Sequence, residues 1–194
     1  SKPIKKSFIN NKGQRVEYWV MKPMNYQTGN QYPLVVDIHG GPSAMWGTGE
    51  ASMWHEFQYY ASKGLGVVYG NPRGSGGYGS NFLAANVKDW GAGPMADIMQ
   101  MTDLAINEGW VDTTQLAVTG GSYAGYLVTW MLGHTNRFKV ACSQRGVYEL
   151  STFFGEGNAW RLNPRYFGGY PWEKMTRVIL DRESPMTYVQ NIRT

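Results

Sequence analysis

The stretch Leu116-Ala117-Val118-Thr119-Gly120-Gly121-Ser122-Tyr123-Ala124-Gly125-Tyr126 decides the fold. A short apolar run of strand-forming residues stops at two glycines, a serine follows, and a helical pattern begins. This order is typical of a nucleophile elbow, a tight strand-to-helix turn that exposes a serine at the carboxyl edge of a sheet. Ala124 stands where the usual Gly-x-Ser-x-Gly pattern has its second glycine. Ser122 is therefore either a nucleophile or a structural serine in a glycine-rich turn, and the rest of the chain must decide.

Strands and helices alternate on both sides of this stretch. Ser7 to Pro23 has the pattern of a β-ribbon, and the segment from Tyr148 to Arg182 is aromatic and irregular, with helical patches. The segments between them are predicted strands at 33–38, 65–69, 116–119 and 138–143, and predicted helices at 54–62, 94–109 and 123–132. Such alternation favours a mostly parallel sheet with helices on both faces, whose active site lies at the carboxyl ends of the strands.

Length and composition exclude several classes of protein. The 194 residues are 42% hydrophobic and 16% charged, which indicates one globular domain. The net charge of +4 comes without a Lys/Arg run beyond Lys5-Lys6, so we expect no nucleic-acid partner. The sequence has no apolar run of 18 residues and no signal-peptide pattern, so we expect no membrane partner and a cytoplasmic location. The single cysteine, Cys142, permits no disulfide framework within the chain and is expected to be a small buried residue.

A second motif fits the first. His39-Gly40-Gly41-Pro42 directly follows the predicted strand at 33–38. Glycines at such a point let backbone N–H groups point at a developing negative charge without a side chain in the way. In an oxyanion hole of this kind, one donor follows the nucleophile and the other comes from the loop after an earlier strand. Tyr123 and Gly41 occupy these two positions.

With these motifs, the chain resembles the catalytic domain of the prolyl oligopeptidase family of serine peptidases, in its acylaminoacyl-peptidase-like branch. The resemblance extends from about Val16 to the C-terminus. It rests on the segments 35–42, 71–79, 89–91 with Asp97, 110–112, 120–126, 165–168 and 184–185. It implies an α/β-hydrolase fold and a peptidase that forms an acyl-enzyme on Ser122, with Gly41 and Tyr123 as the oxyanion hole.

The resemblance also implies that parts of the family's catalytic domain are missing from these 194 residues. The family's triad places an acid and then a histidine after the serine. After Ser122 the sequence contains one histidine and one aspartate, His134 and Asp181. We interpret His134 as the end of the elbow helix and Asp181 as a surface charge. We therefore interpret 1–194 as part of a single α/β-hydrolase catalytic domain that lacks its last strands, its catalytic Asp and His, and the family's β-propeller. We expect this chain alone to be nearly inactive, because a serine without a base is a weak nucleophile.

Substrate contacts are expected from loops and from the aromatic segment. Arg145 and Arg161 lie past predicted strand ends, where each is either a ligand for a peptide carbonyl or carboxylate or a solvated charge. By the resemblance, the aromatic segment covers the nucleophile, so Tyr148 and Phe153 are expected in an apolar pocket. Phe154, Trp160, Tyr166 and Phe167 are further candidates for that pocket or for the core. Arg73 is expected to be structural, paired with Asp89 or Asp97.

Three functions remain open at this point. The leading hypothesis is a serine peptidase acting on short peptides or acyl-peptides; the alternatives are a carboxylesterase on the same fold and a non-catalytic binding module. We expect no cofactor and no metal, because His39, His55 and Glu56 lack the His-Glu-x-x-His spacing of a zinc site. The expected partners are a short peptide substrate and either the missing remainder of the domain or a second copy of the chain, because a truncated sheet leaves an open edge.

Overall fold

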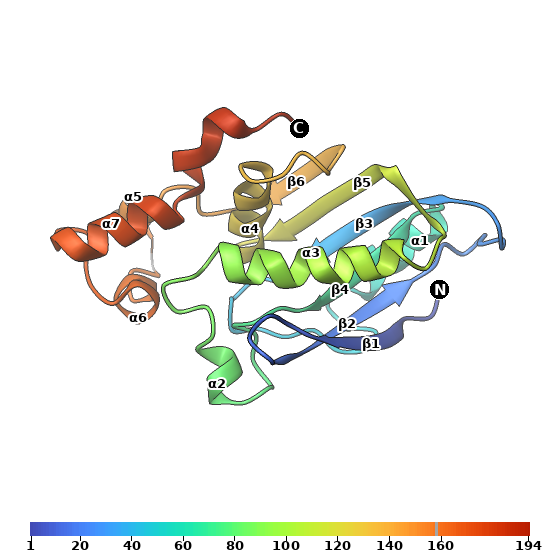
Figure 1. The fold of residues 1–194 in the computed structure, drawn as a ribbon, viewed down its shortest axis with the longest axis horizontal. Coiled ribbons are helices and arrows are strands. Elements are labelled where there is room, and N and C mark those ends of the chain that lie inside the picture. The colour runs from blue at the N-terminus through green and yellow to red at the C-terminus, as the bar shows by residue number, and fades with distance from the viewer. Residues whose placement is uncertain (158) are drawn as a thin grey trace.

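The computed structural model describes residues 1–157 and 159–194, which form one six-stranded sheet covered by helices (Figure 1). The strand order is β1-β2-β4-β3-β5-β6. The strands β4, β3, β5 and β6 run parallel, whereas β1 and β2 add two antiparallel strands at one edge. Their bounds are β1 Ile4–Ile9, β2 Arg15–Met21, β3 Tyr32–Ile38, β4 Gly66–Asn71, β5 Val111–Gly121 and β6 Val140–Gln144.

Helices pack on both faces of the sheet. In Figure 1, α3 crosses in front of the strands and α1 lies behind them, while α5, α6 and α7 gather at the end toward which the parallel strands point. The helical bounds are α1 Trp54–Ser62, α2 Ser80–Leu83, α3 Ala92–Ile106, α4 Tyr123–Leu132, α5 Leu150–Glu156, α6 Leu162–Phe167, α7 Lys174–Glu183 and the 3₁₀ helix η1 Pro185–Asn191. This mostly parallel, two-sided arrangement is the α/β-hydrolase fold that the sequence predicted.

Alternation along the strands builds the two halves of the core. Tyr18 and Val20 of β2 belong to the large apolar cluster on the side of α3 and α4, whereas Trp19 and Met21 belong to a smaller cluster with Phe57 of α1. Successive strand residues point to opposite faces, so both faces of β2 are apolar because both are covered.

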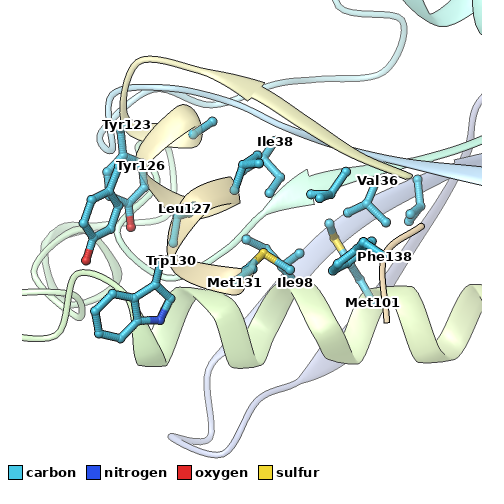
Figure 2. Packing of buried hydrophobic residues seen from close by; sticks show 14 of the residues in the cluster. Val36, Ile38, Ile98, Met101, Tyr123, Tyr126, Leu127, Trp130, Met131 and Phe138 are labelled. Atoms are coloured by element: carbon cyan, nitrogen blue, oxygen red, sulfur yellow. The ribbon is translucent and has the colours of Figure 1, made fainter. Parts of the chain in front are cut away.

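The large cluster fixes helix α4 against the sheet. Figure 2 shows Ile98 and Met101 of α3 and Met131 of α4 close to Val36 and Ile38 of β3. All five side chains are at most 2% exposed. Close packing on this scale makes the N-terminus of α4, and therefore the turn before it, a rigid part of the molecule.

The structure corrects one expectation about the core. Cys142 is exposed rather than buried, and its neighbour Val140 is also exposed. Both lie on β6, which is the outermost strand at its end of the sheet. An apolar strand sequence predicts a covered strand, but whether a neighbour covers it is a property of the whole sheet. Among the described residues, no helix combines the length and the apolar character needed to cross a membrane.

Candidate active site

Ser122 sits at the sharp turn between β5 and α4, where the sequence predicted it. Its backbone has φ 62° and ψ −120°, a conformation that residues other than glycine rarely adopt, and its side chain is exposed. Small neighbours make this turn possible. A Cβ on Gly120 would lie 2.5 Å from the Cβ of Ala124 and 2.8 Å from the carbonyl oxygen of Ile38. The turn therefore tolerates Ala124 in the helix because residue 120 is a glycine.

Tyr123 presents its backbone to the nucleophile and its side chain to the core. As the first residue of α4, it has an N–H without an acceptor inside the helix, and such an N–H is able to bind an anion. The phenol ring contacts the indole of Trp90 at 4.9 Å between centroids, and its hydroxyl donates a 2.7 Å hydrogen bond to the Trp90 carbonyl oxygen. Burial raises the pKa of Tyr123 well above its usual value, so the phenol acts as a neutral anchor.

The loop after β3 lies directly against the elbow. A Cβ on Gly40 would lie 2.9 Å from the Gly121 carbonyl oxygen and 3.4 Å from the Cβ of Ser122. Gly41 has φ +122°, and a Cβ there would lie 2.4 Å from the backbone nitrogen of Ser43. Only glycine fits both positions, so the predicted oxyanion loop and the predicted nucleophile are adjacent in space.

His39 is a structural part of this loop. It is buried, with Nε2 2.8 Å from the hydroxyl of Ser75 and Nδ1 2.7 Å from the carbonyl oxygen of Gly40. The Ser75 hydroxyl oxygen also lies 2.6 Å from the carbonyl oxygen of Pro72. Burial lowers the pKa of His39, so the ring favours its neutral form. Both ring nitrogens are engaged away from Ser122, and His39 therefore joins the loop after β3 to the glycine-rich loop at 71–79.

Arg73 joins the glycine-rich loop at 71–79 to helix α3 through Asp97. Its Nη2 lies 2.5 Å from Oδ1 of Asp97, and its Nε donates to Oδ2 of the same carboxylate at 2.9 Å. The two side chains are 1% and 0% exposed. The pairing with Asp97 resolves the two alternatives left open by the sequence. Such a fully buried bidentate pair ties the loop to α3.

A cavity of about 680 Å³ opens beside Ser122, and we call it the acyl pocket after the role that we propose for it. Six of the seven predicted site residues line it: Gly41, Ser122, Tyr123, Arg145, Tyr148 and Phe153. Further apolar lining comes from Trp90, Val147, Leu162 and Met186, and two carboxylates, Glu149 and Glu156, also line it. Arg161, the seventh, lies at the start of α6 with its guanidinium 5.1 Å from the Trp160 ring and is not among the lining residues.

The aromatic segment divides between pocket, core and surface. Tyr166 and Phe167 are buried and pack on Trp90, so they belong to the core. Phe154 and Trp160 belong instead to an aromatic cluster with Tyr170 and Trp172, outside the residues that line the acyl pocket. Helical spacing explains the division, because Phe153 and Phe154 are neighbours on α5 and face different directions.

Among the lining residues that sequence reasoning missed is Trp90, which is supported by Glu183 of α7. Trp90 lines the acyl pocket, and its backbone N–H donates to Oε2 of Glu183 at 3.0 Å, as does that of Gly91 at 3.2 Å. Glu183 is buried at the end of α7, and burial raises its pKa despite the ion pair with Arg182. The segment Asp89-Trp90-Gly91 is visible in the sequence as a motif, but its partner lies more than 90 residues away and carries no local signal.

The two triad candidates that follow Ser122 in the sequence, His134 and Asp181, are both engaged with other residues. His134 stacks on Trp130 with Nδ1 2.8 Å from that residue's carbonyl oxygen, which agrees with its interpretation as a helix end. Asp181 is an exposed partner of Arg177, as expected. Residues 1–157 and 159–194 contain no group of three or more side chains able to hold a metal ion.

Solved structures share this architecture. The chain aligns over its whole length with an acylaminoacyl peptidase in complex with Z-Gly-Gly-Phe-chloromethyl ketone, at a TM-score of 0.89 and 27% identity, covering 31% of that chain. An acylaminoacyl peptidase from Pyrococcus horikoshii aligns with a TM-score of 0.87 and 26% identity, again over 100% of this chain and 31% of that one.

Relatives by sequence are also peptidases. The "Uncharacterized peptidase YuxL" of Bacillus subtilis (strain 168) is 40% identical over 189 residues, which are 94% of this chain and 27% of the relative. Dipeptidyl-peptidase 5 of Schizosaccharomyces pombe is 33% identical over 181 residues, 91% of this chain and 26% of the relative. The chain thus spans about a quarter of the length of these relatives. The model of the prolyl oligopeptidase family matches residues 51–194, and the chain belongs to this family of serine peptidases.

Proposed function

We propose that Ser122 is the nucleophile of a peptidase that hydrolyses short peptides or acyl-peptides through an acyl-enzyme. The observation that carries the proposal is the position of Ser122, exposed at a strained turn between the glycine loop 40–41 and the acyl pocket. The similar acylaminoacyl peptidase forms a complex with Z-Gly-Gly-Phe-chloromethyl ketone, and this supports a peptide-like ligand for a site of this kind.

In this mechanism the Ser122 hydroxyl oxygen attacks the carbonyl carbon of the scissile bond. The backbone N–H groups of Gly41 and Tyr123 stabilise the negative charge that forms on the carbonyl oxygen. The acyl side chain enters the acyl pocket against Tyr148 and Phe153, while Arg145 binds a peptide carbonyl or carboxylate. The leaving amine takes a proton and departs, and water then hydrolyses the ester on Ser122.

The proton transfers in this scheme need a histidine base, and no histidine of the described residues forms a hydrogen bond with Ser122. All three histidines precede or closely follow the elbow, and His39 and His134 are engaged elsewhere. We propose that 1–194 is the nucleophile-bearing part of one catalytic domain, and that an acid and a histidine from further polypeptide complete it. Loss of triad members typically lowers the rate by several orders of magnitude, so the 194-residue chain alone is nearly inert.

The test compares the 194-residue chain with a longer version of the polypeptide that includes an acid and a histidine. Both are assayed with N-acyl-phenylalanine p-nitroanilide and with p-nitrophenyl acetate, and both are treated with a fluorophosphonate probe. We expect anilide hydrolysis and labelling in the longer version, lost in Ser122→Ala and kept in Ser62→Ala, an exposed serine of α1. Activity confined to the ester would overturn the peptidase, and the absence of labelling would favour a binding module. Equal turnover by the 194-residue chain would refute the proposal that this chain lacks groups needed for catalysis.

A further inference from the structure

A second, smaller hollow of about 170 Å³ touches Ser122 from another side. It lies among the carboxyl ends of β3, β5 and β6 and the helix α1, and Asp37, Glu56, Gln144 and Arg145 line it together with the elbow. Val36 and Ile38 belong to the cluster under α3 and α4, so Asp37 between them faces α1. We call this site the Asp37 hollow.

Asp37 is a buried carboxyl group whose hydrogen bonding is incomplete. It is 1% exposed, and its Oδ2 has no hydrogen-bond partner among the described residues. Burying such an oxygen without a partner is costly, and native structures rarely leave one without a reason. Because Asp37 lines the hollow, a ligand there can supply the missing partner.

Glu56 adds a second carboxylate to the same wall. Its Oε1 accepts a 2.7 Å hydrogen bond from Tyr60, which fixes the side chain on α1. Burial first, and the charge of Glu56 second, raise the pKa of Asp37 well above its usual value. The hollow therefore presents acidic groups that repel each other and that a positive charge would stabilise.

The structure does not supply that charge from its own described side chains. Arg145 also lines the hollow, but its guanidinium packs over Gly121 and its side-chain hydrogen bond goes to Gln144. No ion pair within 4.0 Å joins it to either carboxylate in the described part of the chain. Two carboxylates without a third ligating side chain are a poor donor set for a metal, whereas they suit the several N–H donors of a guanidinium or an ammonium.

We propose that the Asp37 hollow binds a cationic guanidinium or ammonium group between Asp37 and Glu56, beside the nucleophile. The hollow has room for a group of this size together with water, since one water occupies about 30 Å³ in the liquid. The hollow adjoins the acyl pocket and shares only Ser122 and Arg145 with its lining, and its occupation does not depend on the proposed peptidase activity.

The test measures binding of methylguanidinium and of its neutral near-isostere N-methylurea to the 194-residue chain by NMR titration, at constant ionic strength. We expect methylguanidinium to shift resonances around the hollow with an affinity about tenfold higher than N-methylurea, the order expected for a charge-assisted hydrogen bond. Asp37→Asn and Glu56→Gln should each remove most of this difference. Asp103→Asn, which removes an exposed carboxylate from α3 on the other face, should leave it unchanged.

We expect the Glu56→Gln variant to fold even if Asp37→Asn does not, because glutamine can still accept the hydrogen bond from the Tyr60 hydroxyl and residue 56 is only half-buried. Equal affinities for the two probes, or unchanged binding in both variants, would overturn the proposal. Binding should persist in Ser122→Ala, which separates this site from the failure of the peptidase proposal.

The source of the cation is distinguished by a second comparison on the Ser122→Ala variant. Two short peptides differ only in lysine or norleucine directly after the scissile bond. Tighter binding of the lysine peptide that depends on Asp37 and Glu56 assigns the cation to the leaving part of the substrate. Equal peptide binding, with methylguanidinium still bound, assigns it to a side chain of further polypeptide.

Discussion

The hydroxyl group of Tyr123 donates a 2.7 Å hydrogen bond to the backbone carbonyl oxygen of Trp90. One end of Tyr123 thus offers the N–H next to Ser122, and the other end holds the segment that forms a wall of the acyl pocket. Glu183 also holds this segment, because its carboxylate accepts a hydrogen bond from the Trp90 N–H. The backbone N–H proposed as an oxyanion donor and the pocket wall are therefore coupled through one aromatic ring.

We predict that Tyr123→Phe lowers the free energy of unfolding by about 1–3 kcal/mol, because it leaves the buried Trp90 carbonyl oxygen without its donor. Urea denaturation measures the change. Tyr59→Phe is the matched control, since Tyr59 is an exposed tyrosine of α1, and it should change stability by less than about 0.5 kcal/mol. A Tyr123→Phe protein as stable as the unchanged chain would show that the bond is unimportant.

Gly120 and Ala124 form a coupled pair at the elbow. Gly120→Ala would place two Cβ atoms 2.5 Å apart, and we expect it to destabilise the fold by about 1–3 kcal/mol through overpacking. Ala124→Gly in the same chain removes one contact but not the approach to the Ile38 carbonyl oxygen, so the double variant should recover only part of the loss.

The control for this pair is Gly155→Ala on α5, where an added Cβ meets nothing within 4 Å. Alanine in a helix is favoured over glycine, so this variant should be neutral or more stable by up to about 1 kcal/mol. Thermal unfolding of the unchanged chain, the two single variants, the double variant and Gly155→Ala provides the comparison. Additive losses in the double variant would refute the coupling between residues 120 and 124.

Local patterns predicted most of the fold. The helices at 54–62 and 123–132 have the predicted bounds, because apolar spacing and flanking glycines act within one or two turns. The elbow and the loop at Gly40–Gly41 could also be predicted from the sequence, since each is a run of small residues that follows a strand. Their adjacency followed from parallel strands ending at one edge of a sheet.

What the sequence could not show depends on distant partners. The exposure of Cys142 depends on β6 being outermost, which no pattern within β6 reveals. Trp90 lies in the pocket wall because Tyr123 and Glu183 hold its backbone. Arg161 lies outside the lining, just before α6, where its guanidinium stacks over the ring of Trp160. In the sequence, Asp37 is one polar residue in an apolar strand. Its incomplete hydrogen bonding is visible only in the structure, where α1 packs beside it.

The buried pair of Arg73 and Asp97 gives a third prediction. Arg73→Met leaves the Asp97 charge buried and uncompensated, so we expect a loss of about 3–5 kcal/mol in unfolding free energy. Arg73→Met with Asp97→Leu removes both charges and should be less destabilised than the single variant. The exposed pair of Arg177 and Asp181, with side chains 53% and 52% exposed, is the control, and Arg177→Met should cost less than about 1 kcal/mol. If the double variant is the least stable of all, the pair stabilises through more than its charges.

Asp37 gives the fourth prediction, which concerns pH. Its pKa is raised in the folded state, first by burial and then by the charge of Glu56, above the value of 3.8 expected when unfolded. The folded chain therefore holds this proton more tightly than the unfolded chain, and unfolding free energy falls as pH rises from near 3.8 through the folded pKa. The Asp37→Asn variant has no ionisable group at this position, so its unfolding free energy should lack the part of the pH dependence that Asp37 causes. Its stability relative to the unchanged chain should thus increase with pH and level off above the folded pKa of Asp37.

Urea denaturation of both proteins at several pH values between about 4 and 8 measures the difference, and Asp103→Asn, at an exposed carboxylate, serves as the control. A stability difference that stays constant or shrinks with rising pH would mean that Asp37 is ionised at little cost in the fold, and that the hollow has no need of a cation.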